Sequence, residues 1–140
     1  MINIRIAKQI DIPQLEELFY ITRKQTFVNR PESEFHIGDY KKSTAEDQVW
    51  VAELQGVIAG FASIYPKENF IHNLFVGSLF QGQGVGKKLL QTAEEMLSFP
   101  ITLKIAIDNP SAKGFYEHQG WRQISMHLNA IEPYWLYQKG

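Results

Sequence analysis

The 140-residue chain contains no cysteine. Disulfide bonds, thiolate metal ligands and a cysteine nucleophile are therefore excluded, and any group transfer must proceed without a cysteinyl intermediate. The chain also lacks an excess of charge of either sign, because 14 lysines and arginines stand against 15 aspartates and glutamates. Without a basic surplus to meet a phosphate backbone, we do not expect a nucleic-acid partner.

Long apolar runs are missing as well. No run approaches the roughly 18 residues needed to cross a bilayer, and the first residues, MINIRIAKQIDIPQLEEL, contain no signal-peptide core. We therefore expect no membrane partner and a soluble, cytoplasmic protein. His36, His118 and His127 lie far apart and show no metal-ligand spacing, so we expect no metal.

What is present is an ordinary globular composition, with 44% hydrophobic and 21% charged residues. This length predicts one core and one domain over residues 1–140. Apolar alternation predicts strands at residues 3–7, 48–54, 57–65, 70–76, 101–107, 121–128 and 134–138.

Helices are predicted by apolar residues that recur every three or four positions. We expect a first helix capped by Asp11, a second from Val85, and a short one capped by Asn109 or Ser111. Residues 27–47 are weakly periodic and predict a loop with one short helix around 33–42. Hairpins mixed with crossover helices indicate an α+β fold with a mixed sheet.

A glycine-rich loop, residues 81–86 (QGQGVG), lies between the strand that ends at Val76 and the helix that begins near Val85. Free backbone N–H groups and the helix dipole at such a place attract an anion, although a plain flexible turn has the same glycines. A P-loop is excluded because Gln81 occupies its first glycine position and Lys88 its Ser/Thr position. The dinucleotide-binding fingerprint also fails, at its third glycine.

The surviving pattern, Gln-x-x-Gly-x-Gly, resembles the pyrophosphate loop of the GNAT superfamily of N-acetyltransferases, which follows a strand reading Leu-x-Val. Residues 74–76 and 81–86 match these two elements. A second family segment, an asparagine and then Ala-x-x-Phe-Tyr-x-x-x-Gly-Phe/Trp, is matched by Asn109, Ala112, Phe115, Tyr116, Gly120 and Trp121. The resemblance covers residues 70–121 best and implies a GNAT-like, mostly antiparallel mixed sheet of about seven strands, flanked by three to four helices.

The same resemblance implies acetyl-CoA as the cosubstrate. Its pyrophosphate would meet the backbone amides of residues 83–87, and its pantetheine would run beside residues 74–76 as an added strand. Lys87 and Lys88 suit a negatively charged ligand, although Lys88 can equally be a solvated surface lysine. The implied cofactor-binding residues are Leu74, Phe75, Val76, Gln81, Gly82, Gln83, Gly84, Val85, Gly86, Lys87, Asn109 and Phe115.

The resemblance implies Tyr116 as the general acid for the departing thiolate, although the ring could also simply pack its helix on the sheet. The sequence departs from the family at Phe70, where an acidic residue often stands. His72 and Glu68 share the strand parity of Phe70, so His72 is our first candidate for the general base and Glu68 the second. A structural histidine, or a water chain with no single base, remains an alternative.

The resemblance thus implies an N-acetyltransferase that moves an acetyl group from acetyl-CoA to a primary amine by direct attack in a ternary complex. The acceptor, a small-molecule or peptide amine, would bind between the first helix, residues 27–47 and a final hairpin with Tyr134, Trp135 and Tyr137. These aromatic residues could instead fill the core or a homodimer interface. Because Phe70 replaces the usual acid, a non-catalytic acyl-CoA-binding sensor or interaction module is the alternative.

Overall fold

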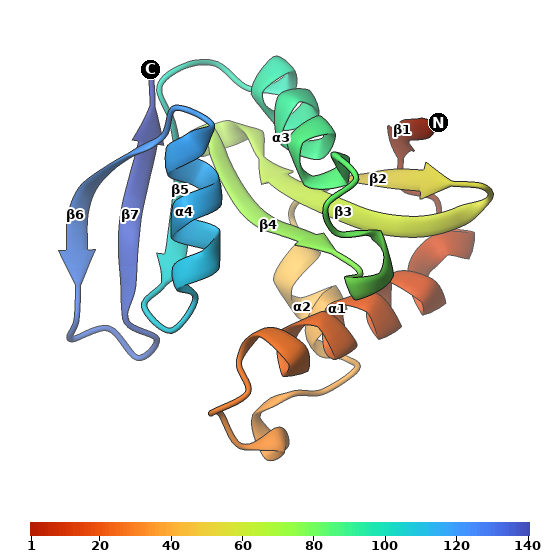
Figure 1. Ribbon diagram of the computed structural model, residues 1–140, viewed down its shortest axis with the longest axis horizontal. Coiled ribbons are helices and arrows are strands. Elements are labelled where there is room, and N and C mark those ends of the chain that lie inside the picture. The colour runs from red at the N-terminus through yellow and green to blue at the C-terminus, as the bar shows by residue number, and fades with distance from the viewer.

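The computed structural model describes residues 1–140 and contains one seven-stranded sheet with helices on both faces (Figure 1). The strands are β1 (Ile2–Ile6), β2 (Gln48–Leu54), β3 (Val57–Tyr65), β4 (Phe70–Val76), β5 (Ile101–Ala106), β6 (Arg122–His127) and β7 (Tyr134–Lys139). The α-helices are α1 (Ile12–Thr26), α2 (Asp39–Thr44), α3 (Val85–Met96) and α4 (Pro110–His118). The predicted α+β fold with a mixed sheet is confirmed.

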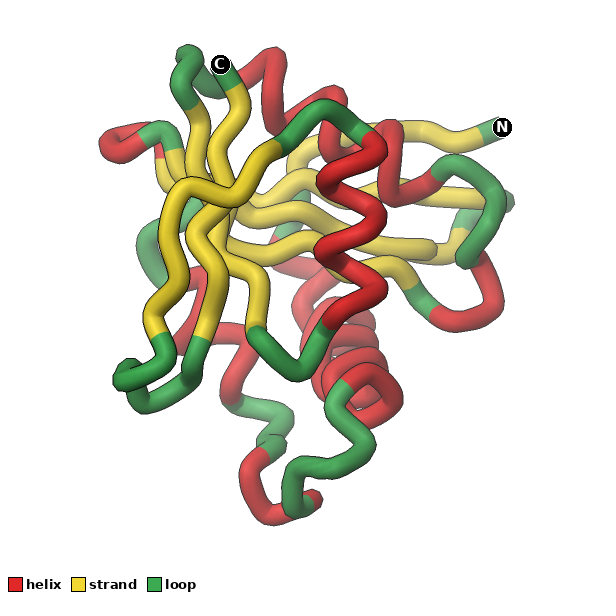
Figure 2. The backbone as a smooth tube through the Cα atoms, turned by 60° about the vertical axis from the view of Figure 1, so that its left-hand side comes forward, coloured by secondary structure: helices red, strands yellow, loops and turns green.

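The sheet has the order β1-β2-β3-β4-β5-β7-β6, and only β4 and β5 run parallel. This parallel pair is short, because it joins only Phe70 to Thr102 and Ile71 to Leu103. Beyond these residues the two strands diverge, and the sheet separates into a β1–β4 half and a β5–β7–β6 half. Figure 2 shows the divergence from another side, with one set of strands running down the left and the other to the right.

Two apolar layers hold the helices on the sheet. On one face, Phe19 of α1 and Tyr40 of α2 pack against Phe61 of β3, with ring centroids 5.8 and 5.6 Å from that of Phe61. On the other face, Leu89 of α3 lies in a cluster with the small residue Ala62. The same face carries α4, whose Tyr116 joins the largest core cluster, formed with β5, β7 and α3. Because helices cover both faces of the sheet, the open region lies where β4 and β5 diverge between the two halves.

A bulge in β4 changes which side chains share a face. Asn73 pairs with Ser63 and Ile71 with Ile64, so His72 is an extra residue with no paired position on β3. Because one inserted residue shifts the alternation, Phe70 and Asn73 lie on the same side of the strand, and Ile71 and Leu74 lie on the other. Phe70 and His72 were expected to share one face of the strand because they are two positions apart, and the bulge at His72 interrupts that alternation.

Two predicted helix features turned out differently. Asp11 does stand before α1, but its carboxylate makes no cap bond to the helix. It accepts hydrogen bonds from the Arg5 guanidinium at 2.7 and 2.9 Å and from the Lys8 N–H at 2.7 Å, because a charged guanidinium competes well with a helix N–H. The short helix of residues 27–47 is α2, which begins later than expected, at Asp39. The Asn109 cap of α4 is confirmed.

Candidate functional site

Two clefts meet where β4 and β5 diverge. The first, of about 690 Å³, borders the glycine-rich loop, and we call it the glycine-loop cleft. The second, of about 760 Å³, lies between α1, α2, β4 and β5, and we call it the central cleft. Both clefts are bordered by the same small set of residues from β4, α4 and the turn before it: Leu74, Phe75, Asn109, Ala112 and Tyr116. Two ligands could therefore meet end to end at this junction.

The glycine-rich loop leaves the start of α3 open. Gly84 precedes the helix with a left-handed φ of +84°, and a Cβ atom placed there would meet nothing within 4 Å. The first hydrogen bond at this end joins the Lys88 N–H to the Gly84 carbonyl at 3.1 Å, so the N–H groups of Val85, Gly86 and Lys87 have no backbone partner. Free N–H groups at the positive end of a helix dipole form an anion site.

Of the two lysines in the first turn of α3, only one lies beside this anion site. Lys87 borders the glycine-loop cleft, whereas the exposed Lys88 borders neither cleft. The structure thus places Lys87 where a negatively charged ligand would lie and leaves Lys88 as a solvated surface residue.

The wall opposite the loop is an unpaired strand edge. Because β4 pairs with β5 only up to Ile71, the backbone edge of residues 74–76 that faces β5 has no neighbouring strand. An extended ligand can lie along such an edge as an added strand. At its end, the Gln81 side chain donates to the Val76 carbonyl at 3.3 Å. Across the cleft, α1 contributes the polar residues Thr22, Gln25 and Thr26.

Asn109 is held at the junction by its capping role. Its Oδ1 accepts hydrogen bonds from the Ala112 N–H at 3.3 Å and from the Ser111 hydroxyl at 3.1 Å. The side-chain amide nitrogen of Asn109 makes no hydrogen bond within the protein, and the residue borders both clefts, so this nitrogen remains available as a donor. Beside it, Phe115 packs against the first turn of α3, with ring atoms 3.6 and 3.8 Å from the position of a Cβ on Gly86.

Tyr116 lies in α4 between the two clefts. Its side chain is largely buried, with ring centroids 5.1 Å from Phe115 and 5.9 Å from Trp121. Burial raises the pKa of the Tyr116 phenol well above its ordinary value. No protein group is hydrogen-bonded to the hydroxyl, so at neutral pH it is a protonated donor without a partner.

His72 sits in the β4 bulge and borders the central cleft. Its Nδ1 lies 2.9 Å from Oδ2 of Asp47, whose side chain is 3% exposed, against 46% for His72. In a neutral imidazole whose Nδ1–H donates to this carboxylate, Nε2 is the ring atom with the free lone pair. This pair could not be found from the sequence, because Asp47 stands 25 residues earlier in a polar segment without a motif.

Glu68 is not in the strand. It ends a short 3-10 turn, Pro66–Glu68, and is exposed. With Phe70 and His72 it borders a third, smaller cleft of about 510 Å³ beside the central one. The structure thus brings His72 and Tyr116 to one cleft and leaves Glu68 outside it.

The final hairpin sends only one aromatic side chain into the central cleft. Tyr134 borders it, whereas Tyr137 is fully buried in the core and donates to Glu117 at 2.6 Å. Trp135 packs against the same core and under the Lys113 ammonium. For Trp135 and Tyr137, the core alternative weighed from the sequence is therefore the observed one.

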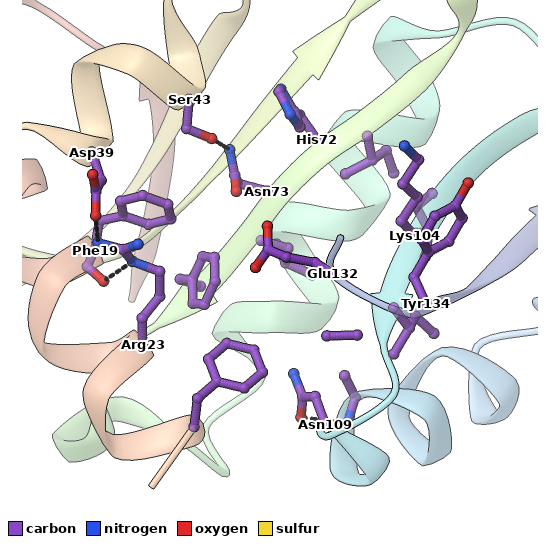
Figure 3. A pocket seen from close by; sticks show the side chains of 18 of the residues that line it. Phe19, Arg23, Asp39, Ser43, His72, Asn73, Lys104, Asn109, Glu132 and Tyr134 are labelled. Carbon is purple, nitrogen blue, oxygen red and sulfur yellow. Dashed lines mark hydrogen bonds and ion pairs between the residues drawn. The ribbon is translucent and has the colours of Figure 1, made fainter. Parts of the chain in front are cut away.

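Polar residues that sequence reasoning missed complete the central cleft (Figure 3). Arg23 and Asp39 lie on one side, and Lys104 lies on the other beside Tyr134, which unlike the rest was expected from the sequence. Between them, the Asn73 amide donates to Ser43 of α2 at 2.9 Å and to the buried Ser63 at 2.9 Å. No sequence pattern marks these residues, because they come from separate elements.

Neither a metal cluster nor a membrane helix accompanies the clefts. The structure contains no group of three or more histidine, aspartate or glutamate side chains placed to hold a metal ion. None of its helices combines the length and apolar character that crossing a membrane requires.

Comparisons with known proteins agree with this arrangement. The sequence model described as the Acetyltransferase (GNAT) family matches residues 15–121. No curated protein sequence matches the chain significantly.

Solved structures with similar folds extend over nearly the whole chain. Apo YjaB from Escherichia coli is 22% identical with a TM-score of 0.81, covering 99% of this chain and 95% of that one. The PaiA N-acetyltransferase of Thermoplasma acidophilum, in complex with coenzyme A, is 18% identical with a TM-score of 0.85, covering 100% and 99%. The ribosomal-protein-S18-alanine N-acetyltransferase of Escherichia coli is 17% identical with a TM-score of 0.72, covering 99% and 92%. At these identities the likeness establishes the fold.

Proposed function

The chain belongs to the GNAT family of acetyltransferases, and on that premise we propose that it transfers an acetyl group from acetyl-CoA to a primary amine by direct attack in a ternary complex. The observation that carries the proposal is the junction of two clefts at Tyr116, one fitted to an anionic, extended ligand and the other open to a second molecule. In this proposal residues 1–140 act as one catalytic domain.

The glycine-loop cleft has the features that acetyl-CoA requires. The free N–H groups at the start of α3 and Lys87 suit a pyrophosphate. The unpaired edge of residues 74–76 suits the amide groups of pantetheine, and the free Asn109 amide can donate to the same arm. When bound, acetyl-CoA supplies an activated acetyl group as a thioester; the residues of this chain bind it, orient it and move protons.

We assign the two proton transfers to His72 and Tyr116, which both border the central cleft. Nε2 of His72 accepts the proton that the amine must lose, directly or through a water molecule. The Tyr116 hydroxyl donates a proton to the sulfur that leaves as the amide bond forms. The charges then balance, because one proton leaves the amine and one reaches the thiolate.

Asp47 is a positioning residue in this scheme. Its buried carboxylate fixes the His72 ring through Nδ1 and so presents Nε2 to the cleft. Glu68 is the second candidate for the base, and it would need water molecules to reach the junction from the neighbouring cleft.

The test begins with acetyl-CoA binding. At about 100 times its Kd, a ligand stabilises the native state by roughly 2.7 kcal/mol, which raises Tm by several degrees. We expect this rise to be lost in Gly84→Asp, which adds negative charge at the anion site. Gly56→Asp is the matched control, because Gly56 also has a left-handed φ of +79° with open space around it and lies in the β2–β3 turn.

Turnover is then measured as amine-dependent release of coenzyme A. The panel contains small amines and peptides, because a protein with this fold is named for acetylating an alanine of a ribosomal protein. Release with any of these amines supports the proposal. Binding of acetyl-CoA without release across the panel would favour the non-catalytic acyl-CoA-binding alternative, and no binding at millimolar acetyl-CoA would overturn both.

A further inference from the structure

The acidic residues of the central cleft are already paired. Asp39 accepts from Arg23 at 3.0 Å. Glu132 accepts from Arg30 at 2.9 Å, and the same guanidinium binds Asp108 through two bonds of 2.8 Å. No other carboxylate borders this cleft. A cationic acceptor would therefore find no carboxylate without a partner.

Two lysines of the same cleft have no acidic partner. Lys42 belongs to α2 and Lys104 to β5, and Figure 3 shows Lys104 across the cleft from Asp39, which is also in α2. The Lys104 ammonium lies 4.6 Å from the centre of the Tyr134 ring, a contact that restricts the side chain without neutralising its charge. The charge left unbalanced in the central cleft is thus positive.

Resting on the proposed function, we propose that the acetyl acceptor is a small amine that also carries a carboxylate, held by Lys104 and Lys42. Its amino group reaches the junction near His72 and Tyr116, where it must lose a proton, and its carboxylate remains at the lysines. A charge-assisted hydrogen bond between ammonium and carboxylate is stronger than a neutral one, and a second positive charge on the acceptor would be repelled.

The walls of the cleft favour a small molecule over a protein chain. Arg30, which follows α1, joins Asp108 of the β5–α4 turn to Glu132 of the β6–β7 turn. Its ring contact with Phe27, 3.9 Å from the guanidinium carbon to the ring centre, fixes the same segment. This bridge holds three separate segments together around the cleft, whose volume of about 760 Å³ is that of a typical small-molecule site.

The first test compares amines that differ only in the carboxylate. The pairs are 4-aminobutyrate with butylamine and phenylalanine with phenethylamine, and spermidine and O-phosphoethanolamine complete the panel. We expect a carboxylated member to have a kcat/KM at least about tenfold above its partner, the gain typical of one charge-assisted contact. Higher kcat/KM for spermidine, for the partners without a carboxylate or for the phosphorylated amine would overturn the proposal.

The second test removes the lysine charges one at a time. Lys104→Gln and Lys42→Gln should each raise KM for the carboxylated acceptor by about tenfold and should not raise KM for its partner without the carboxylate. Lys41→Gln is the matched control, because Lys41 is an exposed lysine of the same helix that borders neither cleft. Equal effects of the two lysine variants on both members of a pair would overturn the assignment.

A binding measurement separates this inference from the proposed function. The N-acetylated forms of 4-aminobutyrate and butylamine are titrated calorimetrically into protein saturated with coenzyme A. We expect the carboxylated product to bind more tightly, with the difference lost in Lys104→Gln and reduced by salt. Equal binding overturns the inference while acetyl transfer to other amines stands. If no amine in either panel is acetylated, the proposed function fails and the inference fails with it.

Discussion

The Tyr116 hydroxyl, which we propose as the general acid, has an acidity that is set by its surroundings. Apolar neighbours raise its pKa, so the phenol stays protonated throughout the pH range in which an amine loses its proton. Removing only this hydroxyl, as Tyr116→Phe, should lower kcat by about 100-fold or more, as for loss of a general acid. The ring packing remains, so the Kd of acetyl-CoA should not change. Stopped-flow single turnovers would measure the chemical step, and an undiminished rate in the folded variant would remove Tyr116 from the mechanism.

The pair formed by Asp47 and His72 predicts a different signature. Asp47→Asn keeps the shape of the buried side chain but can hold the imidazole in the wrong tautomer. We expect kcat to fall by about 10- to 100-fold, the range seen when a supporting partner of a histidine is lost, with little change in KM. Glu46→Gln changes an exposed neighbour that makes no hydrogen bond or ion pair with His72, and it should leave kcat unchanged. The assignment fails if His72→Ala lowers kcat while Asp47→Asn does not.

Residue-level reasoning from the sequence reached the groups that lie in motifs. The glycine-rich loop and the Asn109 cap depend on contacts within a short stretch of chain, and Tyr116 was reached through the second motif of the family resemblance. Asp47 and Lys104 could not be found in this way, because each acquires its role from a residue of another element. The same limit applies to Tyr137, whose alternation in a strand does not distinguish a core from a cleft.

At the scale of elements, Arg5 ties β1 to its neighbours. Its guanidinium binds Glu53 of β2 and the carboxylate of Asp11, which precedes α1. The hydrogen bonds from Arg5 lower the pKa of Asp11, whose side chain is 6% exposed. Three elements therefore share one charged contact far from the clefts.

This contact predicts a defined acid dependence of stability. Because the folded-state pKa of Asp11 is below its unfolded value of about 3.9, its contribution is present above that pH and is lost as pH falls through the folded-state pKa. At pH 7 the free energy of unfolding of Asp11→Asn should be about 1–3 kcal/mol lower than that of the wild type. In acid the two free energies of unfolding should approach each other. Urea titrations at several pH values check this, with the exposed Glu17→Gln as control; parallel curves for wild type and Asp11→Asn would contradict it.

Element boundaries were predictable where apolar periodicity and turn residues agree. The strand at residues 70–76 and the start of α3 at Val85 were found correctly for this reason. The bulge at His72 was not, because an extra residue leaves the composition of a strand unchanged and shows only in its pairing. The later start of α2 reflects weak local preference in residues 27–47, where packing of Tyr40 on Phe19 decides the position.

At the scale of the whole molecule, two half-sheets share only the short β4–β5 pairing and the core around Ile71 and Leu103. The glycine-loop cleft lies between these halves, so a ligand there would contact α3 and β4 on one side and α4 on the other. The sequence predicted the mixed sheet but not this separation, since no local pattern states where a parallel pair stops.

The separation predicts how acetyl-CoA changes protection from hydrogen exchange. We expect slower exchange in residues 74–76 and 83–87, where backbone groups gain partners, and also in α4 across the cleft. The β1–β2 pair and β6 should change little. Mass spectrometry of exchange with and without acetyl-CoA would show the pattern. Protection confined to the loop would mean that the ligand does not join the two halves.

The β4 bulge has a consequence for anyone who edits this strand. The extra residue adds one side chain to the rim of the central cleft while the residues before and after it stay in register with β3. Deleting position 72 would leave Ile71 opposite Ile64 and Asn73 opposite Ser63 as neighbours in a regular ladder, so both sides of the strand would keep their residues. Leu74 and Phe75 would keep their partners Ala62 and Phe61, and the contact with Asp47 would be lost. Shortening the chain by one residue here would thus remove the imidazole and spare the rest of the lining of both clefts.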